Sequence, residues 1–323
     1  DPRGLAELRV ALAGYLGRAR GVLARPENIV ICSGFVHGLA LICRLLSDRG
    51  SSELAIEAYG HALHRRIAAA HAREVASLPV DAEGAVPDAL ESTAAVAAVL
   101  TPAHQFPLGM VLAPQRRSAF VRWAARTGGV IIEDDYDGEF RFDRQPVGAM
   151  QSLAPSQVIY AGTASKSLAP GLRLGWLVVP DSMIDEVIAA KKQSGGANGT
   201  LEQLTLANFI ESGGYDRQIR QTRLAYRRRR DRLIAALRRS APAVRLTGIA
   251  AGMHTVAELP DTESEVEVVA RAAAHGVAIE GLQVYTAQGH EREPALVVGY
   301  GRPAEHAFTT AVSRLCAALA ESA

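Results

Sequence analysis

Apolar residues follow two alternating patterns along the chain. Short continuous apolar runs such as 28–32 predict buried strands, and segments with apolar residues three or four positions apart, such as Leu5 to Arg18, predict amphipathic helices. Strands that alternate with helices and are apolar throughout indicate an α/β fold, whose mostly parallel sheet is sandwiched by helices. The predicted strands are 28–32, 54–57, 74–80, 95–100, 129–132, 158–161 and 176–179, and the clearest helices among them are 35–46, 62–71 and 114–127.

The last third of the chain has a different pattern. Residues 199–239 are helical in periodicity, with a break at Gly213-Gly214. After Pro242, short predicted strands (252–259, 277–280, 295–300) alternate with helices (263–275 and a closing helix from Pro303). We therefore expect a large domain over 26–240 and a smaller α+β C-terminal domain over 241–323. The N-terminal helix within 1–25 is expected to pack with the smaller domain.

Composition narrows the class of protein. A formal net charge of +1 gives no electrostatic case for nucleic acid or a membrane surface as the main partner. The arginine-rich run 227–232 is interpreted as a solvated helix face in preference to a nucleic-acid patch. There is no apolar run of about 18 residues and no signal-peptide pattern, and the three cysteines are scattered without metal-type spacing. These features predict a cytoplasmic protein with buried thiols and no metal site.

Lysine is rare in this chain. Of the 35 basic residues, only Lys166, Lys191 and Lys192 are lysines. An amine, unlike a guanidinium, can lose its proton when buried and attack a carbonyl. Lys166 follows a predicted strand and lies among the hydroxyl residues 163, 165 and 167, so it is a candidate Schiff-base nucleophile. Lys191 and Lys192 are expected on a solvated helix face.

Two further polar clusters follow predicted strands. Residues 133–136 (Glu-Asp-Asp-Tyr) come after a buried run, where a carboxylate could bind a protonated ring nitrogen, although solvated turn acids would explain them equally. Ser33-Gly34 opens a predicted helix, whose free N–H groups and dipole favour an anion, although capping alone would also explain it.

The three clusters together match one ligand. Thr163, Ser165 and Arg173 could hold a dianionic phosphate by charge-assisted hydrogen bonds. An amine for an aldehyde, a carboxylate for a ring nitrogen and an anion site for a phosphate describe pyridoxal 5′-phosphate (PLP).

Three longer motifs carry a specific resemblance. Residues 134–141 (DDYDGEFR) resemble the motif DDYDSEFR, residues 101–109 (TPAHQFPLG) resemble TPSHQFPTG, and residues 162–175 (GTASKSLAPGLRLG) resemble GTFSKTLAPGLRLG. The chain thereby resembles the fold-type-I PLP-dependent aminotransferase superfamily, and within it the effector domain of MocR-type regulators of the GntR class. The resemblance covers essentially the whole chain.

The resemblance implies a role for each matching residue. Lys166 would form the internal aldimine, Asp134 would pair with the pyridine nitrogen, and Tyr136 would hydrogen-bond the ring O3′. The remaining implied contacts are to the phosphate (Thr163, Ser165, Arg173 and the backbone of Gly34 and Phe35), to O3′ or the substrate (His104, Gln105), and to the ring face by stacking (His61).

The chain also departs from the family pattern. His61 replaces the stacking tyrosine and Tyr59 replaces a proline, so either ring could stack. Val36 and His37 stand where glutamines commonly approach the phosphate. Val297 stands where many aminotransferases have the arginine that clamps a substrate carboxylate, with Arg302 close in sequence. The identity of the substrate or effector is therefore open.

Two functions remain as alternatives at this point, together with a fold that has lost its cofactor. The first is a PLP-dependent sensor, in which a small amine or amino acid forms an external aldimine. The second is a free-standing aminotransferase, in which Lys166 also moves the proton. The resemblance further implies a homodimer, no membrane partner, and DNA binding only through an N-terminal helix-turn-helix domain that is missing from this chain.

Overall fold

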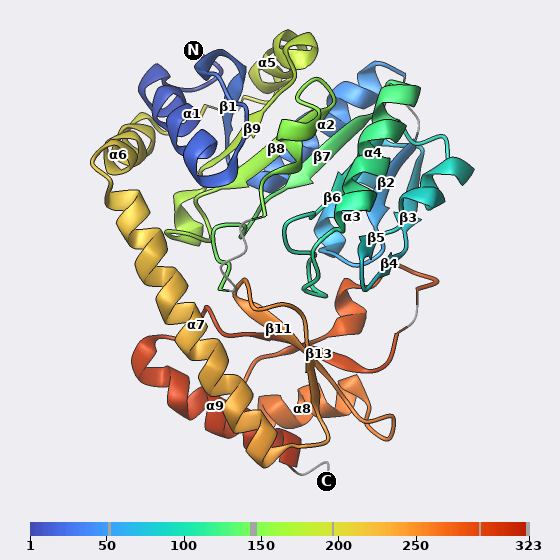
Figure 1. Ribbon diagram of the computed structural model, residues 1–323, viewed down its shortest axis with the longest axis vertical. Helices are drawn as coiled ribbons and strands as arrows, with labels where there is room; N and C mark the ends of the chain where they lie inside the picture. The colour runs from blue at the N-terminus through green and yellow to red at the C-terminus, as the bar shows by residue number, and fades with distance from the viewer. Residues whose placement is uncertain (51–52, 143–146, 196, 291, 321–323) are drawn as a thin grey trace.

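The computed structural model describes residues 1–50, 53–142, 147–195, 197–290 and 292–320. Within these residues the strands form a seven-stranded sheet, a four-stranded sheet and a two-stranded ribbon, β4 (Val80–Asp81) with β5 (Gly84–Ala85). The large sheet and its helices occupy the upper part of Figure 1, and the smaller sheet lies below them. The expected α/β class, with a smaller α+β C-terminal part, is confirmed.

The large sheet is mostly parallel. Its order is β1-β9-β8-β7-β6-β2-β3, in which β8, β7, β6, β2 and β3 are parallel and β9 runs antiparallel to both β8 and β1. Parallel strands bring their carboxyl ends to the same edge, where ligands bind in open α/β sheets. The strands are β1 (Ile29–Cys32), β2 (Glu53–Glu57), β3 (Glu74–Leu78), β6 (Ala97–Leu100), β7 (Val130–Asp134), β8 (Val158–Thr163) and β9 (Gly175–Val178).

Helices cover both faces of this sheet (Figure 1). The helices α2 (Phe35–Asp48), α3 (Ala62–His71) and α5 (Ile184–Gln193) share one apolar cluster with one face. On the opposite face lie α1 (Ala6–Arg20) and α4 (Pro114–Thr127), and α6 (Thr200–Glu211) packs on α1. Helix α5 carries Lys191 and Lys192, which were expected on a helix, although the bounds of this helix were not predicted from the sequence.

The position of α1 differs from the sequence-based expectation. We expected this helix to pack with the smaller domain, but its leucines share a core with Ile29, Ile31 and Trp176 of β1 and β9. Periodicity shows which side of a helix is apolar and does not show which surface covers it. The expectation was therefore wrong about the partner of α1.

The smaller sheet is antiparallel, in the order β10-β11-β13-β12. Its strands are β10 (Arg245–Thr247), β11 (His254–Glu258), β12 (Glu280–Gly281) and β13 (Ala295–Gly299). The helices α8 (Glu265–Ala274) and α9 (Glu305–Ala320), with the second half of α7 (Gly214–Ser240), share a core with one face. The other face packs on residues of the large domain that include Ala58, Tyr59 and Leu108.

Two predicted solvated residues are buried. Lys191 on α5 is 3% exposed and its Nζ donates a hydrogen bond to the carbonyl of Ile31, whereas Lys192 is exposed. Arg229 on α7 is 9% exposed and its Nη2 lies 2.8 Å from a carboxylate oxygen of Glu305. A long side chain can reach an acceptor on a neighbouring element, which a helical pattern alone does not reveal.

The structure also tests the expectations for cysteines and shows whether the described residues include metal clusters or membrane-spanning helices. All three cysteines are buried and free, as expected. Among the described residues no cluster of His, Cys, Asp or Glu could hold a metal ion. None of the described helices is both long enough and apolar enough to cross a membrane.

Candidate functional site

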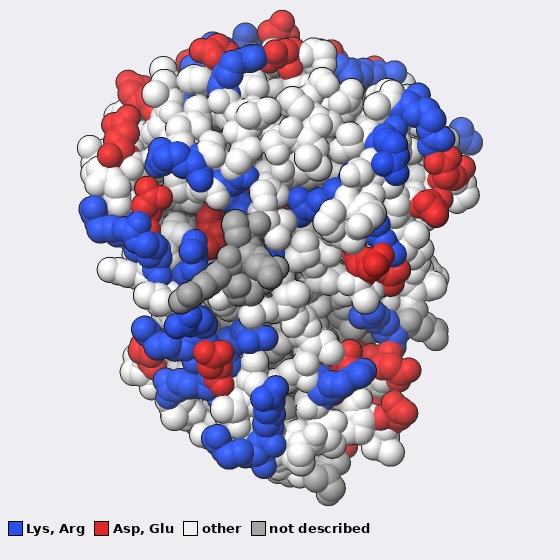
Figure 2. Space-filling model, viewed as in Figure 1, with Lys and Arg blue, Asp and Glu red and all other residues white. Residues whose placement is uncertain are grey.

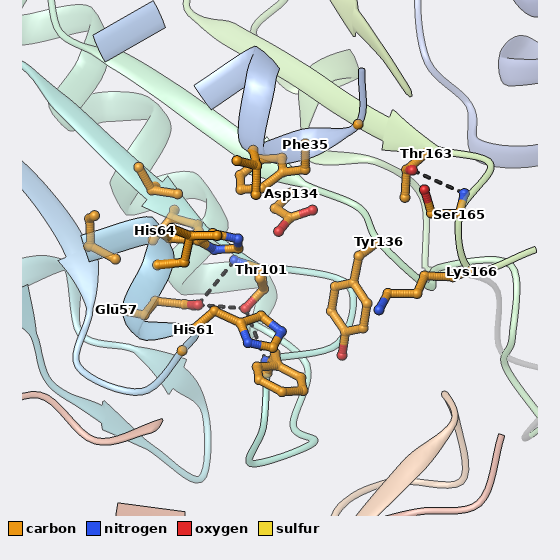
Figure 3. Close-up of a pocket in the computed structure, with 18 of the residues that line it drawn as sticks. Phe35, Glu57, His61, His64, Thr101, Asp134, Tyr136, Thr163, Ser165 and Lys166 are labelled. Carbon is orange, nitrogen blue, oxygen red and sulfur yellow. Dashed lines mark hydrogen bonds between the residues drawn. The ribbon is translucent and has the colours of Figure 1, made fainter. Parts of the chain in front are cut away.

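A cavity of about 340 Å³ opens at the carboxyl ends of the parallel strands. Its wall includes the start of α2, the residues after β8, Met253 before β11, and His254, the first residue of β11. Figure 3 shows the labelled side chains converging on this space. Nine of the eleven residues predicted from the sequence line the cavity: Gly34, Phe35, His61, Asp134, Tyr136, Thr163, Ser165, Lys166 and Arg173.

Lys166 and Asp134 come from the ends of neighbouring strands. Asp134 is the last residue of β7 and pairs in register with Ala161 of β8, five residues before the lysine. The Lys166 amine points towards Tyr136, and the Asp134 carboxylate faces the same space (Figure 3). Burial, reinforced by the charges of Asp135 and Asp137, raises the pKa of Asp134 well above its ordinary value. A positively charged group in the cavity would stabilise its ionised form.

In the turn before α2, the backbone of Gly34 lies close to the backbone of Gly175 in β9. Gly34 has a positive φ of 85°, and a Cβ on Gly175 would lie 2.8 Å from the Gly34 Cα. The two glycines thus let β9 pack directly against the turn. Arg173 lies over the same turn and donates from Nη2 to the Ser33 carbonyl at 2.9 Å.

Two hydroxyl residues at and just after the end of β8, Thr163 and Ser165, also line the cavity. The Ser165 N–H donates to the Thr163 Oγ1 at 3.1 Å, and the Thr163 hydroxyl donates to the Leu174 carbonyl at 3.2 Å. The Ser165 Oγ is shielded from solvent and has no hydrogen-bond partner among the described residues. A buried polar atom without a partner is costly, and an anion bound beside the first N–H groups of α2 would give it one.

The two residues that depart from the family pattern at α2 have separate roles. The Nδ1 atom of His37 accepts a hydrogen bond from the Ser33 N–H at 3.0 Å. Burial lowers the pKa of His37, which keeps the ring neutral and able to accept. Val36 lines the cavity with an apolar side chain. This wall of the site therefore offers an anion backbone N–H groups and does not offer the glutamine amides of the family pattern.

His61 presents a neutral ring to the cavity. It is stacked on Phe106, with ring centroids 4.3 Å apart and planes inclined by 19°. Burial and the nearby Lys166 charge lower the pKa of His61 to about 4. Tyr59 also lines the cavity, but its ring packs under the Arg292 guanidinium at 5.4 Å. Of the two alternatives, His61 is the better placed to stack on a planar ligand.

His104 and Gln105 are buried but do not line the cavity. The His104 Nδ1 lies 2.8 Å from the Asp137 carboxylate and 3.1 Å from the Tyr136 hydroxyl. The Gln105 amide donates to the Tyr59 carbonyl at 3.0 Å and to Glu57 at 3.2 Å. Both residues therefore hold side chains or backbone that do line the cavity.

Glu57 is a cavity residue that the sequence reasoning missed. It ends β2, is 4% exposed, and accepts a hydrogen bond from the Thr101 hydroxyl at 2.5 Å. Burial raises the pKa of Glu57 to about 7. A carboxylate at the end of a buried strand was the signal that identified Asp134, and it applies equally to Glu57. His254 had no such signal, because it reaches the cavity from the smaller sheet.

The cavity offers few cations for a ligand carboxylate. Among the described residues that line the cavity there is one lysine, Lys166, and one arginine, Arg173. Val297 lies in the core between the two sheets, and Arg302 is exposed and outside the wall. The arginine clamp of many aminotransferases is thus not reproduced at either position.

The fold and this cavity define a fold-type-I aminotransferase architecture. The model of the family "Aminotransferase class I and II" matches residues 1–292, and the chain belongs to this family. Among solved structures, LysN, the α-aminoadipate aminotransferase of Thermus thermophilus, superposes with a TM-score of 0.87 at 26% identity, covering 98% of this chain and 82% of LysN.

The chain is also similar in sequence to transcriptional regulators, which indicates its group within this family. The chain is 35% identical over 322 residues to YhdI of Bacillus subtilis (strain 168), an uncharacterized HTH-type transcriptional regulator, covering 98% of this chain and 67% of YhdI. It is 33% identical over 273 residues to the probable rhizopine catabolism regulatory protein MocR of Rhizobium meliloti, covering 84% of this chain and 55% of MocR. The chain corresponds to the aminotransferase-like domain of MocR-family regulators and spans between half and two thirds of their length.

Proposed function

We propose that this chain is the PLP-binding, amine-sensing effector domain of a MocR-type transcriptional regulator. The observation that carries the proposal is the convergence in one cavity of an amine (Lys166), a buried carboxylate (Asp134) and an anion-binding turn (Gly34 with Ser165 and Arg173). The unpartnered Ser165 hydroxyl and the raised pKa of Asp134 both fit a ligand with a phosphate at one end and a protonated ring nitrogen at the other.

When bound, PLP supplies an aldehyde that captures amines and a ring that withdraws electrons. Lys166 provides the resident amine at the aldehyde. The Asp134 carboxylate holds a proton on the ring nitrogen, and the His61 ring covers one face of the cofactor. Thr163, Ser165, Arg173 and the first N–H groups of α2 bind the phosphate, with Phe35 among the backbone donors.

Tyr136 binds O3′ and is itself positioned by His104. The His104 Nδ1 lies 2.8 Å from the Asp137 carboxylate and 3.1 Å from the Tyr136 hydroxyl, and burial together with the Asp137 charge raises the pKa of Tyr136, which keeps the tyrosine protonated. His104 thus acts through Tyr136, and Gln105 acts through Glu57. Neither residue touches the ligand in this proposal.

The residues expected to contact the substrate favour a sensor over a free-standing aminotransferase. An amino-acid transaminase requires a strong carboxylate contact, and neither Val297 nor Arg302 provides one on the cavity wall. In the proposed sensor, Lys166 would hold the aldehyde of bound PLP until a small amine or amino acid exchanged with it, and the lysine would be released as a free amine. The proposal includes a cytoplasmic homodimer that binds DNA through a helix-turn-helix region of the longer protein, as the names of its relatives suggest.

Replacement of the lysine tests the proposal. The purified chain, incubated with PLP, should show visible absorbance from a protonated imine and should gain the mass of PLP after borohydride reduction. Lys166→Ala should lose both, whereas Lys192→Ala, which changes an exposed lysine, should keep both. A reducible adduct that persists in Lys166→Ala would contradict the assignment.

Titration separates the two functions. A sensor should change its absorbance with particular amines without net transfer of the amino group to a 2-oxo acid. Rapid transfer to 2-oxoglutarate would instead establish the aminotransferase.

A further inference from the structure

Helix α7 concentrates the positive charge of this nearly neutral chain. Ten of the 35 lysines and arginines lie on α7, all of them arginines, but only two of the 34 aspartates and glutamates do. The rest of the chain is therefore net acidic. A charge asymmetry of this kind creates a local field that the overall net charge of +1 conceals.

Seven of these arginines form one stripe on the helix. The exposed members, which we call the α7 stripe, are Arg217, Arg220, Arg227, Arg228, Arg232, Arg238 and Arg239. At about 100° per residue they fall within an arc of roughly 140°, opposite the buried Tyr215, Ile219, Leu233 and Leu237. At about 1.5 Å per residue the stripe is roughly 33 Å long. Basic side chains follow the course of α7 in the space-filling view (Figure 2).

The stripe has few acidic neighbours: Asp231 lies within its arc, and Glu305 interacts electrostatically with Arg228 and Arg232. Within the described residues, no carboxylate forms an ion pair within 4.0 Å with any of its seven guanidinium groups. Their described hydrogen bonds go to neutral groups, as in Arg217 with the Ser212 carbonyl and Arg232 with the Thr309 hydroxyl. Elsewhere some arginines have acidic partners (Arg44 with Asp48, Arg49 with Glu186, Arg126 with Glu91, Arg245 with Glu258), whereas the exposed Arg66, Arg122 and Arg302 form no ion pair within the described residues. The stripe therefore differs from the rest of the surface in the number of arginines on one helix face.

We infer that the α7 stripe binds the phosphate backbone of double-stranded DNA. Guanidinium groups bind phosphate oxygens with matching geometry, and duplex DNA presents phosphates along a length greater than that of the stripe. An anionic membrane is a poorer fit, since surface-binding helices insert an apolar face and Leu224 is the one large apolar side chain exposed on the described α7. The relatives are HTH-type regulators, so DNA would lie close to this domain in the longer protein.

This inference goes beyond the proposed function and does not depend on PLP. It differs from two expectations from the sequence, that the arginine run is a solvated face in preference to a nucleic-acid patch and that DNA binds only through a domain missing from this chain. Contacts to phosphates would position the domain on DNA without reading the base sequence.

The salt dependence of DNA binding tests the inference. The purified chain, with and without added PLP, would be titrated with a labelled random-sequence duplex longer than the stripe, over a series of salt concentrations. In the variant R217Q/R220Q/R227Q/R228Q, the slope of log K against log salt should fall in magnitude by about 3 to 4, because each lost phosphate contact removes about 0.9. Lysine at the same four positions should retain most of the slope, because the charge is kept.

The matched control removes the same charge from elsewhere. In R44Q/R49Q/R126Q/R245Q four exposed, ion-paired arginines are lost, and the slope should stay at the wild-type value. An equal fall in both variants, no binding of DNA by the wild type, or binding to anionic phosphatidylserine vesicles in preference to DNA would each overturn the inference. Circular dichroism and the absorbance of bound PLP should be unchanged in all variants, which keeps this test separate from that of the proposed function.

Discussion

Asp134 and Asp135 are adjacent in sequence but lie in opposite environments. Asp134 faces the cavity, and no described cation forms an ion pair with it within 4.0 Å. Asp135 faces the α1 side, where Arg20 Nε lies 2.6 Å and Arg20 Nη2 lies 3.0 Å from its two oxygens, and the Tyr160 hydroxyl donates to it at 2.8 Å. Successive side chains at the end of a strand point to opposite faces, which separates the two carboxylates.

This difference distinguishes a structural side of the strand end, which faces α1, from a side that faces the cavity and is open to a ligand. On the α1 side the fold supplies every partner that the carboxylate needs, including the Gly138 carbonyl that accepts from Arg20 at 3.0 Å. On the cavity side, the described residues give the Ser165 hydroxyl no hydrogen-bond partner and Asp134 no ion pair within 4.0 Å, and burial raises the pKa of Glu57 to about 7. Such groups are candidate ligand contacts where they line a cavity, as Ser165 does. Trp176 Nε1 in the α1-side core also has no partner among the described residues, but it does not line this cavity.

The largest expected effect comes from removing the buried ion pair between Arg20 and Asp135 on the α1 side. Arg20→Met should lower the free energy of unfolding by about 3–5 kcal/mol, because it leaves the buried Asp135 carboxylate without its counter-charge. Urea denaturation would measure the loss. Arg18→Met on the same helix is the control: its side chain is 63% exposed, and the change should cost less than about 1 kcal/mol. Similar losses in both variants would refute the proposed importance of the Arg20–Asp135 pair.

On the cavity side, Glu57→Gln should change the pH dependence of stability of the PLP-free chain. The folded carboxyl keeps its proton up to about pH 7, whereas an unfolded glutamate releases it near pH 4.3, so stability is lost as the pH rises between these values. The contribution is on the order of 3 kcal/mol at about 1.36 kcal/mol per pKa unit.

Urea midpoints from pH 4.5 to 8 would measure this change. The Gln variant should lose less stability over this range than the wild type does. Burial also raises the pKa of Glu133 and of Glu139 to about 7, so part of the wild-type fall should remain. Identical pH profiles for the two proteins would show that Glu57 is not buried as a proton-holding acid.

The smallest expected effect separates the two aspartates most sharply. Asp134→Asn should weaken PLP binding by about 1.5–3 kcal/mol, or roughly 10- to 150-fold, by removing a charge-assisted contact to the ring nitrogen. In the absence of PLP it should raise the free energy of unfolding at neutral pH, because the folded carboxyl favours its protonated form and an amide carries no such penalty. Equilibrium PLP titration and urea denaturation would measure the two effects.

Asp135→Asn should show the reverse behaviour. Stability should fall because the partners of Asp135 are fixed, and PLP affinity should change little in the folded fraction. If both aspartate variants lost stability and PLP affinity to the same extent, the distinction between Asp135, with partners supplied by the fold, and Asp134, open to a ligand, would be wrong.

The sequence by itself determined the fold class and the residues that end the parallel strands. Strand and helix periods are local properties of the chain, and carboxyl-end residues of parallel strands converge whatever the details of packing. Lys166, Asp134 and Ser165 were therefore identifiable before their geometry was known, with help from motifs that resemble a known family. Glu57 could have been found by the same reasoning.

The tertiary structure decided which partner each side chain has. It placed α1 on the large sheet, buried Lys191 and Arg229, moved His104 and Gln105 behind the cavity wall, and brought His254 in from the smaller sheet. It also gave Arg20 to Asp135 and left Asp134 open to the cavity. Partners of this kind are separated by tens or hundreds of residues, and local patterns carry no information about which distant surfaces meet.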